Sequence, residues 1–297
     1  MPQRYDVIII GGSSAGLSAA MTLGRSLRKV LVIDSNEPCN IQTPRSHNFI
    51  TQDGKAPAEI AAFIKQEVLK YPTITFIADK AINAIAEENG FTVETKTEKF
   101  QTENILLATG LTDMMPDIPG FAECWGISIL HCPYCHGYEV RGQETAILAN
   151  GEAAYHLGIL INHWTQKITA LTNGISELRN EEAEKLSALN INVIENEIEA
   201  FVHTDGQLEK VKFKDGTYFP IKVMYASIPF RQQSDLAEKL GCKFNAHGHI
   251  DIDAEQRTSI TGVYAAGDNT AQHRAISVAA ASGTRAGFAI NAEMILK

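Results

Sequence analysis

The sequence has no cluster of basic side chains and no long apolar run. Among its 297 residues, Lys and Arg number 26 and Asp and Glu number 35, which gives a formal net charge of -9. Affinity for nucleic acids comes largely from clustered Lys and Arg, so this composition argues against such a partner. The longest apolar run near the start, Val7 to Ile10, stops at Gly11 and is too short for a signal sequence or a membrane-spanning helix. We therefore expect a cytoplasmic protein without a nucleic-acid or membrane partner.

Cysteine is scarce and unevenly placed. Of five cysteines, Cys39, Cys124 and Cys242 stand alone, whereas Cys132 and Cys135 are separated by two residues. A secreted disulfide framework normally has an even number of regularly spaced cysteines, so this pattern argues against one. In a reducing compartment a single close pair is either catalytic or metal-binding. The sequence assigns no role to the three isolated cysteines.

The chain is long for one hydrophobic core and comfortable for two domains. Its first stretch predicts a buried strand at 6–10, a glycine turn, a helix of small residues at 15–23 and a second strand at 29–33. A parallel strand pair joined by a helix is a βαβ unit. A second such pattern begins with a strand at 145–149. From Gly241 onward, the sequence pattern is again that of the first domain. The order predicts one α/β domain interrupted by another.

The first glycine turn carries a nucleotide fingerprint. Gly11, Ser13 and Gly16 occupy the key positions of G-x-G-x-x-G between a strand and a helix, where the backbone approaches a pyrophosphate at a helix N-terminus. Asp34 ends the second strand, where a carboxylate can accept from ribose hydroxyls. The predicted nucleotide contacts here are Gly11, Ser13, Ser14, Ala15, Gly16 and Asp34. A glycine turn that binds nothing is the alternative.

Two later segments also end a strand in glycine: Ala108-Thr109-Gly110 and Thr261 to Asp268. With the first turn they resemble the FAD-binding pattern of disulfide oxidoreductases that have two dinucleotide domains. The resemblance implies that Asp268 reaches the polyol chain and that the helix from Ala275 to Gly287 directs backbone N–H groups at the flavin. In isolation, Asp268 is also typical of a helix cap. The residues implied to contact FAD here are Thr109, Gly110, Gly267, Asp268, Ala275 and Ile276.

Cys132-Pro133-Tyr134-Cys135 is the most informative motif. Two intervening residues let both sulfurs meet across one helical turn, and proline is favoured at the first helical position. The first cysteine would then lie at the positive end of the helix, which lowers its pKa. A zinc site would need two further ligands; His131 and His136 flank the pair too closely, and no second C-x-x-C exists. We predict a redox pair and no metal, with unreactive buried thiols as the other alternative.

Taken whole, the chain resembles the low-molecular-weight thioredoxin reductase family over nearly all of its length. The resemblance implies an α/β fold of two Rossmann-like, three-layer ββα dinucleotide-binding domains, the second inserted in the first, and a homodimer. On this basis, residues 1–113 and 229–297 form the FAD-binding domain and residues 114–228 form the inserted module that carries the C-x-x-C. It also implies that Cys135 lies against the flavin and that Cys132 exchanges with the substrate.

Two departures from the family pattern concern the source of electrons. The reductases follow the C-x-x-C with Asp-Gly, whereas here His136-Gly137-Tyr138-Glu139 follows, which resembles the FAD-dependent dithiol oxidases of gliotoxin- and holomycin-type metabolites and their bacterial relatives. His136 would be the base for thiol deprotonation. Glu139 would orient it or balance its charge, unless it is simply a solvated helix residue. We therefore predict Cys132, Cys135, His136 and Glu139 as catalytic.

The second departure lies at the expected NADPH site. The turn 149–154 keeps only the middle glycine of G-x-G-x-x-A, and Glu152 lies near the pyrophosphate position. Residues 171–174 contain no arginine where the 2′-phosphate should be recognised, although that recognition relies on paired charge. NADPH is therefore a doubtful cofactor.

The leading hypothesis is an FAD-dependent oxidoreductase that takes electrons from a small dithiol and passes them to oxygen without NADPH. One alternative reduces a thioredoxin-like protein, with electrons from NADPH or from a protein donor such as ferredoxin. Another is a flavoprotein that senses redox state without turnover. Trp125 and Trp164 either line the substrate site or serve packing alone.

Overall fold

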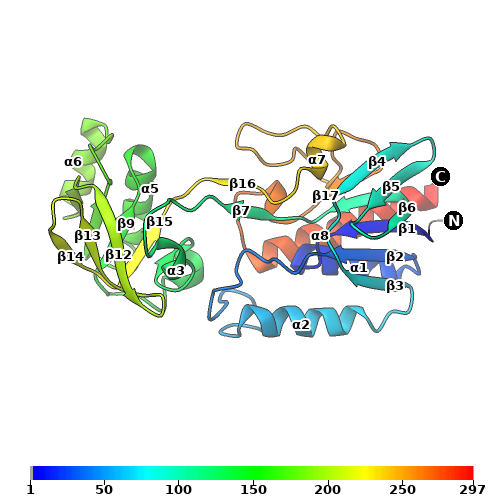
Figure 1. Ribbon diagram of the computed structural model, residues 1–297, viewed down its shortest axis with the longest axis horizontal. Helices are drawn as coiled ribbons and strands as arrows, with labels where there is room; N and C mark the ends of the chain where they lie inside the picture. The colour runs from blue at the N-terminus through cyan, green and yellow to red at the C-terminus, as the bar shows by residue number, and fades with distance from the viewer. Residues whose placement is uncertain (1–2, 297) are drawn as a thin grey trace. The chain divides into compact units, whose positions relative to one another are not determined.

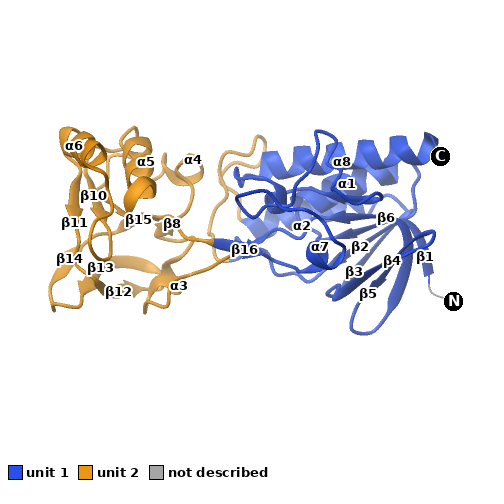
Figure 2. Cartoon of the chain, turned by 90° about the horizontal axis from the view of Figure 1, so that it is seen from above, with its two compact units in different colours: residues 1–41, 57–112, 230–297 blue, residues 42–56, 113–229 orange. Residues whose placement is uncertain are grey.

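The computed structural model describes residues 3–296, which form two compact units (Figure 2). Unit 1 comprises residues 1–41, 57–112 and 230–297, and unit 2 comprises residues 42–56 and 113–229. The sequence analysis gave residues 42–56 to the FAD-binding part, whereas here they group with unit 2. The reason is a long-range contact: the Gln42 side-chain amide donates to the carbonyl oxygens of Ala122 and Trp125 in unit 2.

Unit 1 is built on a seven-stranded sheet with the order β3-β2-β1-β6-β5-β4, and β17 also pairs with β6 (Figure 1). The pairs among β3, β2, β1, β6 and β17 are parallel, whereas β4 and β5 form an antiparallel extension. The strands are β1 (Gln3–Ile10), β2 (Val30–Asp34), β3 (Ile74–Ala78), β4 (Asn83–Glu87), β5 (Gly90–Glu94), β6 (Lys99–Leu107) and β17 (Val263–Ala265). Val7 to Ile10 are buried, as a continuous apolar run predicts for a strand covered on both faces.

Helices cover the sheet of unit 1 on one face. They are α1 (Ser14–Arg25), α2 (Pro57–Val68) and α8 (Ile276–Leu296), while α7 (Leu236–Lys239) lies on the other face (Figure 1). Small residues let α8 approach α1 closely, because a Cβ added at Gly283 would lie 1.9 Å from the carbonyl oxygen of Ala15. The predicted helix that begins at Ala275 is present and extends well beyond Gly287.

Unit 2 has three layers around a parallel sheet of order β11-β10-β9-β15-β8. Its strands are β8 (Ile129–Leu130), β9 (Thr145–Leu148), β10 (Ile168–Leu171), β11 (Asn192–Ile194) and β15 (Val223–Ala226). One apolar cluster lies between this sheet and the helices α5 (Gly151–Ile161) and α6 (Asn180–Ala188). A second cluster packs the other face against α3 (Phe121–Cys124) and an antiparallel sheet of β12 (Ile198–Thr204), β13 (Gln207–Phe213) and β14 (Tyr218–Pro220). The helix, parallel-sheet and antiparallel-sheet layers confirm the predicted ββα class.

The chain passes between the units in two short strands, β7 (Leu111–Asp113) and β16 (Phe230–Gln232), which form a two-stranded sheet. These crossings make unit 2 an insertion between the first and last parts of unit 1. Within residues 3–296, no helix combines the length and the apolar character that crossing a membrane requires.

Candidate redox and cofactor sites

The first glycine turn of unit 1 lies at the carboxyl end of β1 and leads directly into α1. A Cβ added at Gly11 would lie 2.1 Å from the carbonyl oxygen of Ala108, and one at Gly16 would lie 1.8 Å from that of Gly11. Gly12 donates its backbone N–H to Asp34 Oδ1 at 2.9 Å. A Cβ at Gly12 would meet the Asp34 side chain at 2.9 Å, so the turn has no room for a side chain at this position either. Gly12 was not among the predicted nucleotide contacts.

The two later glycine segments lie at the same edge of the unit 1 sheet. Thr109 and Gly110 follow β6, and Gly267 follows β17, the strand that pairs with β6 in parallel. Asn269, which was not predicted, is fully buried and joins these segments: its Nδ2 donates to the carbonyl oxygen of Leu107 at 2.9 Å. The sequence offers no signal for it beyond its place after Asp268.

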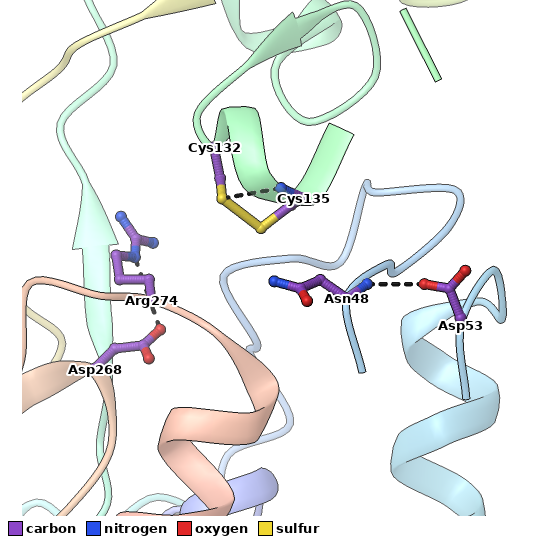
Figure 3. Close-up of a disulfide and its surroundings, with 6 residues drawn as sticks. All are labelled: Asn48, Asp53, Cys132, Cys135, Asp268 and Arg274. Atoms are coloured by element: carbon purple, nitrogen blue, oxygen red, sulfur yellow. Dashed lines mark hydrogen bonds and ion pairs between the residues drawn. A yellow bond between two sulfur atoms is a disulfide. The ribbon is translucent and has the colours of Figure 1, made fainter. Parts of the chain in front are cut away.

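Asp268 is the first residue of a single 3₁₀ turn, η1 (Asp268–Thr270), whose N-cap is Gly267. Its Oδ2 lies 3.7 Å from Nε of Arg274 (Figure 3). Arg274 immediately precedes Ala275 and Ile276, and α8 begins at Ile276. Asp268 and Arg274 therefore form an ion pair at this edge, and Arg274 was not among the predicted residues.

These residues fit a dinucleotide. The turn at Gly11, Gly12 and Gly16 brings backbone close to other backbone with no room for a side chain, which suits close approach by a pyrophosphate. The Oδ1 of Asn269 is a buried acceptor that lacks a hydrogen-bond partner among residues 3–296. A buried acceptor of this kind is normally satisfied by protein, water or ligand.

The cysteine pair of unit 2 is a disulfide in the structure, with its Cα atoms 5.3 Å apart (Figure 3). Cys132 is the N-cap of α4 (Pro133–His136), proline occupies the first helical position, and Cys132 Sγ accepts the backbone N–H of Cys135 at 3.2 Å. The predicted one-turn geometry is confirmed. Because α4 has only four residues, the N–H of Cys135 stabilises negative charge on Cys132 more directly than a helix dipole would.

The alternative of a zinc site finds no support around the pair. Between residues 3 and 296, no three side chains of His, Cys, Asp or Glu lie close enough together to hold a metal ion. Cys124 and Cys242 are buried, and burial raises the pKa of both thiols. Neither of these thiols is therefore disposed to act as a nucleophile.

His136 ends the turn that carries the disulfide. Burial lowers the pKa of His136, the nearby His47 lowers it further, and Glu139 opposes both. A lowered pKa keeps the imidazole neutral, and therefore able to accept a proton, at neutral pH. The Glu139 carboxylate also lies beside His47, with 3.6 Å between Oε1 and Nδ1.

His47 was not predicted. It lies in residues 42–56 of unit 2, its side chain is 18% exposed, and its ring meets that of His136 edge-on with centroids 6.3 Å apart. Its Nδ1 also lies 3.5 Å from Asp53 Oδ1, which accepts the backbone N–H of Asn48 at 2.8 Å (Figure 3). No local motif marks His47, because only the folding of unit 2 brings it to the disulfide turn.

The tryptophans hold different places in unit 2. Trp125 is buried and stacks on Phe121, which supports the packing alternative for that residue. Trp164 meets the ring of Tyr134 edge-on, and a Cβ added at Gly137 would lie 2.8 Å from its Nε1. Trp164 therefore packs directly against the disulfide turn.

In the second nucleotide-type turn, at the start of α5, a side chain of the protein accepts a backbone N–H group of the turn. Asn150 Oδ1 accepts the backbone N–H groups of both Gly151 and Glu177 at 2.8 Å. Glu152 lies in the first turn of α5, and Glu177 Oε2 would lie 3.8 Å from a Cβ at Gly151. Arg179, which the sequence analysis did not consider, donates from Nε to Glu182 Oε1 at 3.0 Å. Carboxylates therefore border this turn, and the Arg179 guanidinium is paired with Glu182.

Comparisons with known proteins identify the family. The model of the family described as pyridine nucleotide-disulphide oxidoreductase matches residues 5–283. The thioredoxin reductase tcpT of Claviceps purpurea is 33% identical over 98% of this chain and 94% of its own. Among solved structures, the thioredoxin reductase TrxB of Bacillus anthracis superposes with a TM-score of 0.93 at 33% identity, over 98% of both chains. HlmI gives 0.92 at 31% identity, over 98% of this chain and 92% of its own.

These relatives confirm the predicted resemblance, including its link to gliotoxin- and holomycin-type enzymes. They also confirm the predicted fold class. The chain therefore belongs to the pyridine nucleotide-disulphide oxidoreductase family and is a thioredoxin reductase-like, flavin-dependent disulfide oxidoreductase.

Proposed function

We propose that this protein is an FAD-dependent dithiol oxidase that works without NADPH and delivers electrons to oxygen. The observation that carries the proposal is the second nucleotide-type turn. Asn150 Oδ1 already accepts the N–H of Gly151, and the carboxylates of Glu152 and Glu177 border the same helix start. A helix N-terminus attracts phosphate through free N–H groups and positive potential, and both are reduced here.

The cysteine pair has the form of an electron acceptor for thiols. A substrate thiolate attacks Cys132 Sγ, the disulfide breaks, and Cys135 leaves as a thiolate. The second substrate thiol loses its proton and attacks the substrate sulfur of this mixed disulfide, which releases Cys132 and closes the substrate disulfide. The substrate loses two electrons and two protons, and the cysteine pair gains the two electrons.

The other residues have supporting roles in this proposal. His136 accepts the thiol proton, since burial lowers its pKa and keeps its imidazole neutral. The cradle at Gly11, Gly12 and Gly16 holds FAD with Asp34, and Asp268 binds its polyol chain. When bound, FAD supplies the two-electron acceptor that returns the cysteines to the disulfide and that oxygen reoxidises to give hydrogen peroxide.

Oxygen consumption tests the proposal. With a small dithiol such as dithiothreitol, the purified protein should consume one oxygen molecule and form one hydrogen peroxide for each disulfide closed. Cys135→Ser should abolish turnover and leave FAD bound, whereas Cys39→Ser, which alters an exposed cysteine of unit 1, should behave as wild type. Turnover that survives Cys135→Ser would refute the electron path, and a protein that no dithiol reduces would favour the redox sensor.

A second candidate is supported by the names of the relatives. Several are thioredoxin reductases, and Tyr134 between the cysteines is 61% exposed, so a protein substrate has a side chain to contact. In this version a thioredoxin-like protein receives electrons from NADPH or from a protein donor such as ferredoxin. Reduction of thioredoxin by the protein under anaerobic conditions, with either donor, would favour it over the oxidase. The homodimer that the resemblance implies stays a prediction, which light scattering of the purified protein tests.

A further inference from the structure

Closing a disulfide releases two protons, and unit 2 holds a second imidazole beside the first. His47 and His136 meet edge-on with ring centroids 6.3 Å apart, although they come from segments far apart in sequence. Two carboxylates face His47: Glu139 Oε1 lies 3.6 Å and Asp53 Oδ1 lies 3.5 Å from its Nδ1. The site therefore holds two imidazoles that can each accept one of the two protons, and two carboxylates that lie beside one of these imidazoles.

A single imidazole holds only one added proton at a time. Once His136 carries the first proton, it is an imidazolium beside the mixed disulfide and accepts the second only after it has given the first to another group. Two cationic imidazoles this close would repel each other. Glu139 and Asp53 place negative charge beside His47.

The surroundings of the pair support this arrangement. Tyr225, on β15, is buried and its hydroxyl has no hydrogen-bond partner among residues 3–296. Burial and the charge of Glu139 raise the pKa of Tyr225, so its phenol stays protonated and does not compete as a base. Residues 46–55 are held by the Ser46–Lys55 bridge and by the Asn48 N–H on Asp53, so His47 is presented on a closed loop.

We infer that His47, supported by Glu139 and Asp53, is a positioning residue that takes up, through His136, the second thiol proton of the reaction. This inference rests on the proposed direction of electron flow and assigns its second half-step to a particular side chain. First, the attacking thiol gives its proton to His136. His136 then passes that proton to His47, which restores the neutral base for the second thiol as it closes the substrate disulfide.

The two half-steps can be separated by trapping. The oxidised protein is mixed with dithiothreitol without oxygen, quenched with acid, alkylated, and analysed by mass spectrometry for dithiothreitol bound to Cys132. In His47→Gln, formation of this mixed disulfide should stay within about twofold of wild type. Its closure should slow by about tenfold or more, since a positioned base contributes about 10²- to 10⁴-fold. The mixed disulfide should therefore accumulate in this variant, and closure should recover as pH rises toward the thiol pKa.

Two further variants serve as comparisons for His47→Gln. His136→Gln should slow formation of the mixed disulfide itself and prevent its accumulation. His156→Gln is the matched control, because His156 also pairs with a glutamate, Glu152 at 3.3 Å, but on the exposed surface of α5. It should change neither step. Should His47→Gln fail to fold by circular dichroism, Glu139→Gln removes a carboxylate that supports it, and closure should again slow more than formation.

Closure at the wild-type rate in His47→Gln, or equal slowing of both steps, would overturn the inference. For Glu139→Gln, unchanged closure would do the same. Dithiothreitol reduces accessible disulfides whatever the physiological partner, so this comparison remains valid if the proposed oxidase fails. Rapid reduction of the wild-type flavin by NADPH would count against the proposed function alone.

Discussion

The imidazole of His47 and the carboxylate of Glu139 lie 3.6 Å apart and join two separate parts of unit 2 at the redox disulfide. Glu139 follows the turn that carries Cys135, and His47 comes from the loop that precedes α2. The basicity at the disulfide therefore depends on a loop that no cysteine motif includes. This relationship decides how the rate of the thiol reaction should respond to pH.

Removing the charge of Glu139 should shift the pH profile of the first step, formation of the mixed disulfide at Cys132, to lower pH. Burial and His47 lower the pKa of His136, while Glu139 raises it. An imidazole acts as a base only when neutral, so the rate rises as pH passes upward through this pKa. In Glu139→Gln the opposing influence is lost, the pKa falls further, and the half-maximal rate moves to lower pH.

Acid-quenched trapping of the mixed disulfide between pH 5 and pH 8, about the range in which histidine titrates, measures this shift. Glu152→Gln is the control, because it removes a carboxylate paired with the surface residue His156. A profile that moves to higher pH in Glu139→Gln would mean that Glu139 does not support the charged form of His136.

The glycine turn of unit 1 should not tolerate a methyl group. In Gly16→Ala the new Cβ would lie 1.8 Å from the carbonyl oxygen of Gly11, so backbone must move where the cradle forms. We expect loss of bound FAD and a destabilisation of about 1–3 kcal/mol or more, the usual cost of overpacking. Flavin absorbance per protein after gel filtration, together with the melting temperature, measures both effects.

Gly142→Ala gives the matched control for that substitution. Gly142 has a positive φ of 73°, but an added Cβ would meet no atom within 4 Å. It should cost about 1–2 kcal/mol of backbone strain and leave FAD bound. Full retention of FAD in Gly16→Ala would show that the cofactor does not depend on this turn.

Neutralising the carboxylates at the start of α5 should improve NADPH binding. Each charge near a helix N-terminus contributes about 0.3–1 kcal/mol, so removing two of them in Glu152→Gln with Glu177→Gln should tighten binding by about 3- to 30-fold. Glu181→Gln, in the first turn of α6, removes an acidic side chain elsewhere and should have no effect. Calorimetric titration with NADPH compares the affinities of the wild type, the Glu152→Gln/Glu177→Gln double variant and Glu181→Gln. Equal affinity in all three would show that these carboxylates do not oppose NADPH binding.

Local patterns predicted the parts of the fold that are set by local chemistry. The buried apolar run of β1, the glycine turn after it and the proline at the start of α4 each follow from a few adjacent residues, and each is present. The ββα class and the family were also correct. These features depend on periodicity, turn conformation and hydrogen-bonding capacity, which short segments carry.

The features that the sequence did not reveal depend on long-range contacts. His47 and Asp53 reach the disulfide turn because residues 42–56 fold with unit 2, and Asn269 is set by its bond to Leu107 across the sheet. The closure of the second nucleotide turn by Asn150 was equally hidden, since its partner Glu177 lies on another loop. No spacing rule encodes these pairs.

Anaerobic mixing shows whether the flavin takes its electrons from a dithiol or from NADPH. The purified protein with FAD is mixed separately with NADPH and with dithiothreitol, and the visible band of oxidised flavin is followed in a stopped-flow spectrometer. The account predicts rapid bleaching by the dithiol, its loss in Cys135→Ser, and no bleaching by NADPH on the timescale of turnover. Rapid bleaching by NADPH would contradict it.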